Sequence, residues 1–272
     1  MFRLLITLLC LATPALAQTT PRADGGQTPY LEYIRTSAAC PSLAILSPGF
    51  GGTERGLWQL ADALADQGFR VIVIGHRESG PVQLRKALRA NNRFAAIIKA
   101  AGDPAAHRAR FLDLDAVWKI ATAPCRPKFA LLAGHSMGAQ TTMIEAGALS
   151  LIGPMGQNRF DAYVALSPQG VGQRFGPGAW RAITKPVLMI TGTRDSGVDG
   201  GYQTRLSAFD GLPPGKKRLA VIAGASHMNL GGRGGGPLVD LVPRIVLAFL
   251  GDLSAARTGS IRPISGVEFR KK

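Results

Sequence analysis

The sequence lacks any apolar run of the roughly 20 residues that a membrane-spanning helix needs. A shorter apolar stretch, LLITLLCLA, follows Arg3 and is itself followed by Ala15-Leu16-Ala17. A basic residue, a short apolar core and an A-x-A site in this order are typical of a secretory signal peptide. We therefore expect residues 1–17 to be removed on export, which leaves a periplasmic or secreted protein that begins near Gln18.

Cysteine is scarce, with 3 residues in the whole chain. Cys10 lies in the apolar stretch without the small residue before it that lipid attachment requires, and it would leave with the signal peptide. Cys40 and Cys125 remain, an even number in an exported chain, where oxidation is permitted. The pair is compatible with one disulfide or with two buried thiols.

Acidic residues are also few, since 17 Asp and Glu face 32 Lys and Arg and the formal charge is +15. This balance could favour weak association with anionic surfaces such as a lipid headgroup layer. The basic residues are scattered and no nucleic-acid motif or internal repeat is present, so we expect no nucleic-acid partner. We also expect no metal and no cofactor. The glycine-rich stretch 231–236 does not directly follow a strand as a phosphate loop should.

The chain does have a regular alternation of apolar strands and helical segments. Residues 18–36 are expected to form a linker and one short strand, and residues 253–272 a flexible basic tail. Asp103 and Pro104 suit the N-cap and first position of a helix that runs to about Thr122. The alternation predicts one α/β domain, a mostly parallel sheet with helices on both faces. The expected strands are 43–47, 69–76, 129–135, 162–168, 186–192 and 217–224, and residues 77–101 are expected to form one or two irregular helices.

The most informative motif is GHSMG, residues 134–138, which lies between an apolar strand and a helical segment. A serine between two glycines at a strand-to-helix turn is the pattern of a nucleophile elbow. The turn is so sharp that side chains two residues either side of Ser136 would collide with neighbouring elements.

A serine nucleophile needs a base and a base needs an acid. Of the 4 histidines, His227 follows the last expected strand at its carboxyl edge, where α/β sites are assembled, and we favour it over His76. Asp195 follows the strand before it and is the favoured acid, with Asp199 as the alternative. Ser136, Asp195 and His227 then keep the chain order of Ser, acid, His.

The backbone N–H groups of Met137 and Phe50 are the candidates for an oxyanion hole. Phe50 belongs to SPGFGG, residues 47–52, directly after the first core strand. Glycines such as Gly51 would let that backbone approach a substrate closely.

Together GHSMG, SPGFGG, Asp195 in GTRD and His227 in GASH resemble the α/β-hydrolase superfamily over nearly all of residues 43–250. The resemblance is greatest to dienelactone-hydrolase-like, platelet-activating-factor-acetylhydrolase-like and bacterial polyester hydrolases. It implies one hydrolase domain over residues 37–252 in which strands 43–47 and 129–133 are neighbours. Cys40 and Cys125 would then lie at adjacent strand ends, and the resemblance implies that they form a disulfide.

The short segment 169–185 is too small for the helical cap that many lipases insert there, so we expect an open cleft. Phe50, Met137, Gln169 and Trp180 are candidates for its walls, and residues 77–101 could partly roof it. The expected activity is that of an exported serine esterase acting on a small or lipid-like ester through an acyl-enzyme at Ser136. The alternatives are an acyltransferase or amidase with the same triad, or a binding protein that retains a hydrolase fold.

Overall fold

The computed structural model describes residues 17–254 and 262–272, so nearly all of the expected signal peptide lies outside the described residues. A single sheet runs through the molecule, and its strands are β1 (Gln18–Pro21), β2 (Gln27–Tyr33), β3 (Leu43–Ser47), β4 (Arg70–Ile74), β5 (Ala130–His135), β6 (Ala162–Leu166), β7 (Val187–Arg194), β8 (Lys217–Ser226) and β9 (Val267–Lys271). The helices are α1 (Trp58–Asp66), α2 (Pro81–Leu88), α3 (Arg93–Ala101), α4 (Pro104–Thr122), α5 (Met137–Glu145), α6 (Tyr202–Asp210), α7 (His227–Leu230) and α8 (Pro237–Ser254), with a 3-10 turn at Arg77–Ser79.

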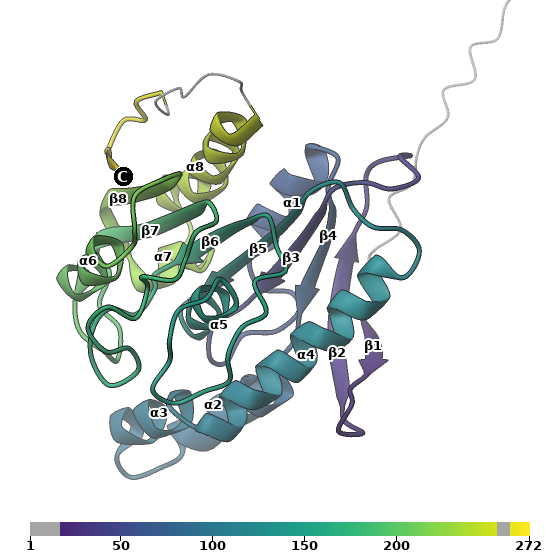
Figure 1. Ribbon diagram of the computed structural model, residues 1–272. Helices are drawn as coiled ribbons and strands as arrows, with labels where there is room; N and C mark the ends of the chain where they lie inside the picture. The colour runs from purple at the N-terminus through teal and green to yellow at the C-terminus, as the bar shows by residue number, and fades with distance from the viewer. Residues whose placement is uncertain (1–16, 255–261) are drawn as a thin grey trace, which may run out of the picture.

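The nine strands pair in the order β1-β2-β4-β3-β5-β6-β7-β8-β9 (Figure 1). The six strands from β4 to β8 in this order are parallel, whereas β1, β2 and β9 pair antiparallel at the two edges. The predicted mostly parallel sheet is confirmed, and β3 pairs with β5 as the resemblance implied. The carboxyl ends of β5, β6, β7 and β8 therefore meet at one edge, which is where the site residues lie.

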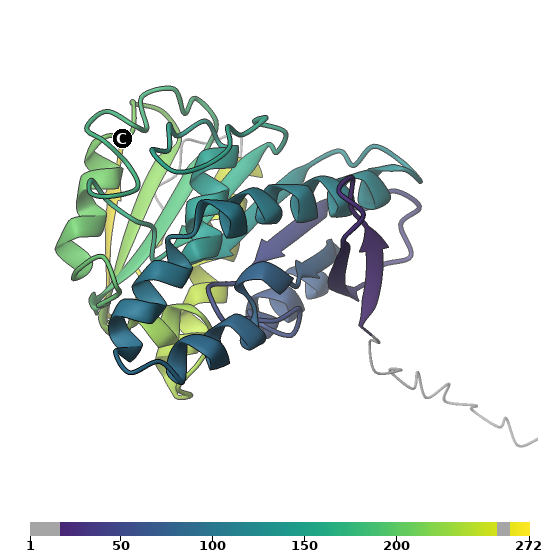
Figure 2. The same ribbon diagram turned by 90° about the horizontal axis from the view of Figure 1, so that it is seen from below.

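Two apolar cores form because alternate residues of each strand point to opposite faces. Leu43 and Ile45 of β3 pack with α4, α5 and α6 on one face. Ala44 and Leu46 pack with α1 and α8 on the other face. Figures 1 and 2 show helices on both sides of the sheet, which is what buries both faces of strands as apolar as these.

The N-terminal helix cap predicted for α4 is present, since Asp103 Oδ1 accepts a hydrogen bond from the backbone N–H of Ala105 at 2.9 Å. Residues 77–101, predicted as irregular helices, form the 3-10 turn and the helices α2 and α3. Pro81 stands at the first position of α2, where its missing N–H costs nothing.

Two predictions about the ends of the domain need correction. Residues 18–27, expected to be a linker, form β1 and a turn that leads into β2, and Arg22 in this turn bonds Glu78 and Asp113. Part of the expected flexible tail forms β9, which pairs with β8. In β9 the alternating Val267 and Phe269 pack against the second core, a short pattern that a sequence window overlooks.

Cys40 and Cys125 form a disulfide, as the resemblance implied. The two cysteines precede β3 and β5, which are parallel neighbours with Leu43 beside Ala130. The bond therefore joins the amino ends of two adjacent strands, at the edge of the sheet opposite to the site.

Within residues 17–254 and 262–272, no helix combines the length and the apolar character that crossing a membrane requires. The same described residues hold no cluster of three or more His, Cys, Asp or Glu side chains that could bind a metal ion.

Candidate active site

Ser136 lies at the junction of β5 and α5 in a strained backbone conformation, with φ 54° and ψ −116°. A residue other than glycine rarely adopts a positive φ, and such strain clusters at functional sites. A Cβ at position 134 would meet the carbonyl of Gly138, and a Cβ at position 138 would meet the carbonyl of Ser47. The two glycines of GHSMG are therefore required by close backbone approaches, as the motif predicts.

His227 begins α7 directly after β8, and its imidazole contacts Asp195 rather than Asp199. The Nδ1 atom lies 2.9 Å from Asp195 Oδ1, so the ring N–H donates to the carboxylate. The same nitrogen lies 2.9 Å from Ser167 Oγ. Among the described residues Nε2 has no hydrogen-bond partner, and the ring lines the same cleft as Ser136.

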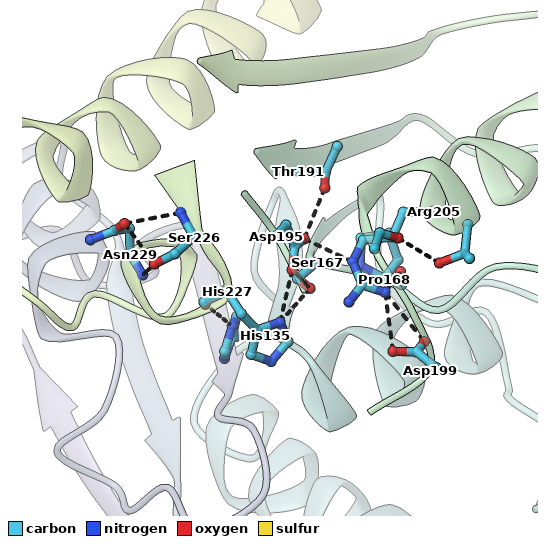
Figure 3. A network of polar contacts seen from close by, with 12 residues as sticks. His135, Ser167, Pro168, Thr191, Asp195, Asp199, Arg205, Ser226, His227 and Asn229 are labelled. Atoms are coloured by element: carbon cyan, nitrogen blue, oxygen red, sulfur yellow. Dashed lines mark hydrogen bonds and ion pairs between the residues drawn. The ribbon is translucent and has the colours of Figure 1, made fainter. Parts of the chain in front are cut away.

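The carboxylate of Asp195 is fully buried and is held by side chains from three further positions (Figure 3). Ser167 Oγ donates to Oδ1 at 2.9 Å, while Thr191 Oγ1 and Arg205 Nε donate to Oδ2, each at 2.8 Å. Burial raises the pKa of Asp195, but the hydrogen bond from His227 and the charge of Arg205 outweigh it and lower the pKa to about 2. Asp195 is therefore ionised throughout the neutral range and fixes the proton of His227 on Nδ1.

His135 is not placed as a base. Its Nε2–H donates to the backbone carbonyl of His227 at 2.9 Å, and the two ring centroids are 4.7 Å apart (Figure 3). Burial and the nearby charge of His227 lower the pKa of His135 to about 3. The ring therefore stays neutral at pH 7 and positions the chain that carries His227.

His76, the less favoured base, lies in a separate buried network behind the loop that follows β3. Its Nδ1–H donates to Asp113 Oδ2 at 2.8 Å, and Nε2 accepts from Ser47 Oγ at 2.9 Å. Arg110 adds a further contact by donating to the carbonyl of Pro48. Because Ser47 and Pro48 begin the SPGFGG loop, this network holds that loop at the carboxyl edge of the sheet. Burial, aided by the charge of Arg110, lowers the pKa of His76 to about 4.

The backbone N–H groups of Phe50 and Met137 have no acceptor among the described residues. Met137 is the first residue of α5, whose opening N–H groups have no partner within the helix. The N–H groups of the next loop residues are occupied, since Gly51 donates to Ser79 and Gly52 donates to Gly49. The amides of Phe50 and Met137 are therefore available as donors to a bound oxyanion.

An open cleft of about 500 Å³ surrounds Ser136 and His227. Leu84 of α2 and Phe94 and Ile97 of α3 form one apolar wall, so residues 77–101 partly roof the site as predicted. Met228 and Arg233 also line the cleft. The remaining lining residues include Pro48, Gly49, Phe50, Leu57, His135, Gln169, Val198 and Asp199.

Three residues expected to contact a substrate, Trp180, Met137 and Gly51, are not among those that line the cleft. Met137 is buried, with 3% of its surface exposed. Trp180 is fully buried in the first core, where it packs against Phe175 at 5.2 Å between ring centroids. Gly51 turns away toward α2, and a Cβ there would meet Leu84. Gln169 does line the cleft.

The sequence analysis missed Ser167, Thr191 and Arg205, which all hold Asp195. Ser167 directly follows β6 at the carboxyl edge, a position that could have marked it as a site residue. Arg205 lies on α6, ten residues beyond Asp195 in sequence, and no local pattern identifies its partner. Its contact exists only because α6 packs beside β7.

The sheet order and the position of the site define the chain as having the α/β-hydrolase fold. A candidate dienelactone hydrolase from Klebsiella pneumoniae subsp. pneumoniae superposes with a TM-score of 0.64 at 18% identity, over 88% of this chain and 99% of that one. XC6422 from Xanthomonas campestris is described as an α/β serine hydrolase without a lid. It superposes with a TM-score of 0.58 at 18% identity, over 89% of this chain and 97% of that one. Thermogutta terrifontis esterase 2, phosphonylated by cyclosarin, superposes with a TM-score of 0.61 at 17% identity, over 92% of this chain and 97% of that one.

No protein-family model and no curated protein sequence matches the chain. The fold implied by the sequence motifs is confirmed by these structures.

Proposed function

We propose that the protein is a serine hydrolase that cleaves carboxylic esters through an acyl-enzyme on Ser136. The observation that carries the proposal is the strained Ser136 at the β5–α5 junction, in one cleft with an imidazole whose Nδ1 is bound to a buried carboxylate. The esterases and serine hydrolases among the similar folds support the same reaction class.

In this mechanism Ser136 Oγ attacks the ester carbonyl carbon and its proton passes to Nε2 of His227. Hydrogen bonds between nucleophile and base often tighten only when substrate is bound. Asp195 stabilises the imidazolium that forms, and the amides of Phe50 and Met137 donate to the oxyanion. The tetrahedral intermediate expels the alcohol, which takes the proton from Nε2. Water then attacks the acyl-enzyme by the same steps and releases the carboxylic acid.

The test combines covalent labelling with turnover. A fluorophosphonate should label wild-type protein and leave Ser136→Ala unlabelled. Nitrophenyl esters of increasing acyl length should be hydrolysed by wild type, and Ser136→Ala should lose at least about 10³-fold in kcat. A nitroanilide with the same acyl group tests amide cleavage in the same assay. Wild-type protein that is neither labelled nor active at any chain length would refute the proposal.

Export is the second part of the proposal, supported by the leader-like residues 1–17 and by the Cys40–Cys125 disulfide, a bond that persists in oxidising compartments. Mass spectrometry of the protein from its native host should find a mature chain that begins at or near Gln18. An intact N-terminus at Met1 would contradict this expectation.

A further inference from the structure

A second cavity of about 300 Å³ adjoins the catalytic cleft. Gln169, Val198 and Asp199 line both spaces, so the two are adjacent at these residues. The walls of the second cavity come mainly from the segment after β6, residues 169–174, and from Ile98 of α3. The second cavity therefore lies beside the cleft that contains Ser136.

Arg174 lines the second cavity, and its guanidinium has no hydrogen-bond acceptor among the described residues. The side chain is 7% exposed, and its Nε is buried without a partner. The other buried arginines of the site region have acceptors, Arg110 at the carbonyl of Pro48 and Arg205 at Asp195. Leaving a buried charged donor without an acceptor is unfavourable, so a guanidinium in this setting is suited to an anionic partner.

Arg174 is the one basic side chain among the described residues that line the second cavity. Asp199 is the acidic residue among those that line it, and Asp199 is already paired with Arg205, whose NH1 lies 3.2 Å from Oδ2 and 3.3 Å from Oδ1. Burial lowers the pKa of Arg174 from its usual value, which a guanidinium withstands while remaining charged at neutral pH. The side-chain Oε1 of Gln169, also buried without a partner, stands where the two cavities meet.

We propose that the cavity around Arg174 binds a carboxylate carried by the substrate at a distance from the scissile ester. The natural substrates are then esters with a free carboxylate, such as half-esters of dicarboxylic acids. A planar guanidinium pairs with a carboxylate through two parallel hydrogen bonds, which supplies affinity and fixes the register of the ester at Ser136. This inference rests on the proposed esterase function and narrows its substrate class.

The test compares esters that differ only in the remote charge. Nitrophenyl half-esters of glutaric, adipic and suberic acid are paired with their methyl-capped counterparts, and 4-acetoxybenzoate places the carboxylate on the alcohol side. Wild type should favour at least one carboxylate ester about 10-fold in kcat/KM, mainly through KM. Arg174→Met should remove the preference, and Arg174→Lys should retain part of it.

Two further arginines serve as controls. Arg181 lies exposed seven residues after Arg174, and Arg181→Met should keep the wild-type preference. Arg233 lines the catalytic cleft, and loss of the preference in Arg233→Met but not in Arg174→Met would place the anion outside the proposed cavity and overturn the inference. A wild type without preference for any carboxylate ester would also overturn it.

A failure of the esterase function gives a different result, because no ester of either series would then be hydrolysed. In that event, calorimetric titration with glutarate and adipate tests the cavity directly. Binding that weakens at least 10-fold in Arg174→Met supports the anion site, and binding that is absent or unchanged refutes it.

Discussion

Asp195 receives hydrogen bonds from His227, Ser167, Thr191 and Arg205, and its carboxylate is fully buried. The contact with Arg205 joins two fully buried charges at 2.8 Å. Removing one partner of such a pair leaves the other charge uncompensated, which typically costs about 3–5 kcal/mol. Arg205 is therefore as important to the site as the residues that face the cleft.

Arg205→Met should lower the free energy of unfolding by about 3 kcal/mol or more, measured by urea denaturation. It should also raise the pKa of Asp195, because the charge of Arg205 helps hold that pKa near 2. The carboxylate contribution to stability, present above about pH 4 and lost toward pH 2, would then be lost at a higher pH. Arg181→Met, on the exposed surface, is the control. A variant as stable as this control would contradict the role assigned to Arg205.

The buried network behind the SPGFGG loop joins elements that are far apart in sequence. Asp113 of α4 bonds His76 after β4 and Thr28 of β2, and His76 bonds Ser47 of β3. These contacts set the position of the loop that carries the Phe50 amide. A displacement of about 1 Å in a catalytic group can cost about 10²-fold in rate.

Asp113→Asn should therefore lower kcat for ester hydrolysis by about 10- to 100-fold while KM changes little, measured with a short nitrophenyl ester. Glu78→Gln is a matched control, because Glu78 contacts Arg22 at the outer end of the network but not His76. Equal kinetics in Asp113→Asn and Glu78→Gln would show that the network does not position the loop.

The disulfide ties β3 to β5 at the edge opposite to the site, and it closes a loop of 85 residues. In the chain-entropy model such a loop is worth about 4 kcal/mol. The double variant Cys40→Ser, Cys125→Ser should lose roughly this stability, measured by urea unfolding against unreduced wild type. Thiol titration of unfolded, unreduced wild type should find no reactive cysteine in the mature chain. Two reactive thiols would exclude the bond.

For the whole molecule, three buried histidines should make stability depend on pH. Burial is the first cause of the lowered pKa in each, to about 4 for His76 and His107 and about 3 for His135. Between these values and the ordinary 6.5, the unfolded chain binds protons that the folded chain does not. Stability is thus fully present above about pH 6.5 and falls as the pH drops toward 4.

With up to three protons involved, the free energy of unfolding should fall by as much as about 4 kcal/mol per pH unit between pH 6 and 5. Urea denaturation at several pH values measures this slope. His107→Gln, in a residue that contacts none of Ser136, Asp195 and His227, should reduce the slope by about one third. A flat profile between pH 5 and 7 would contradict neutral burial of these rings.

The succession of strands and helices along the chain could be predicted from the sequence because the signals for these elements are local. Short apolar runs marked the parallel strands, and the Asp103–Pro104 pair marked the start of α4. The edge strands escaped prediction for a physical reason. β1 and β9 are stabilised by pairing with β2 and β8, and their own residues carry only a few alternating apolar side chains.

The residues of the candidate site also differ in whether a local sequence signal predicts them. Ser136, Asp195 and His227 could be proposed from the sequence because each follows a parallel strand, and parallel strands bring their carboxyl ends to one edge. The glycines of GHSMG were predictable because the turn itself excludes side chains at positions 134 and 138.

Only the tertiary structure decided which groups surround these residues. Packing of α6 against β7 brings Arg205 to Asp195, and the fold turns Trp180 into the core and leaves Arg174 unpaired beside the cleft. Such contacts depend on how elements distant in sequence pack, and no local pattern encodes them. The sequence by itself thus determined the alternation of strands and helices and the candidate residues Ser136, Asp195 and His227, because these signals are local. Tertiary packing determined their charge environment and the shape of the space that a substrate would fill.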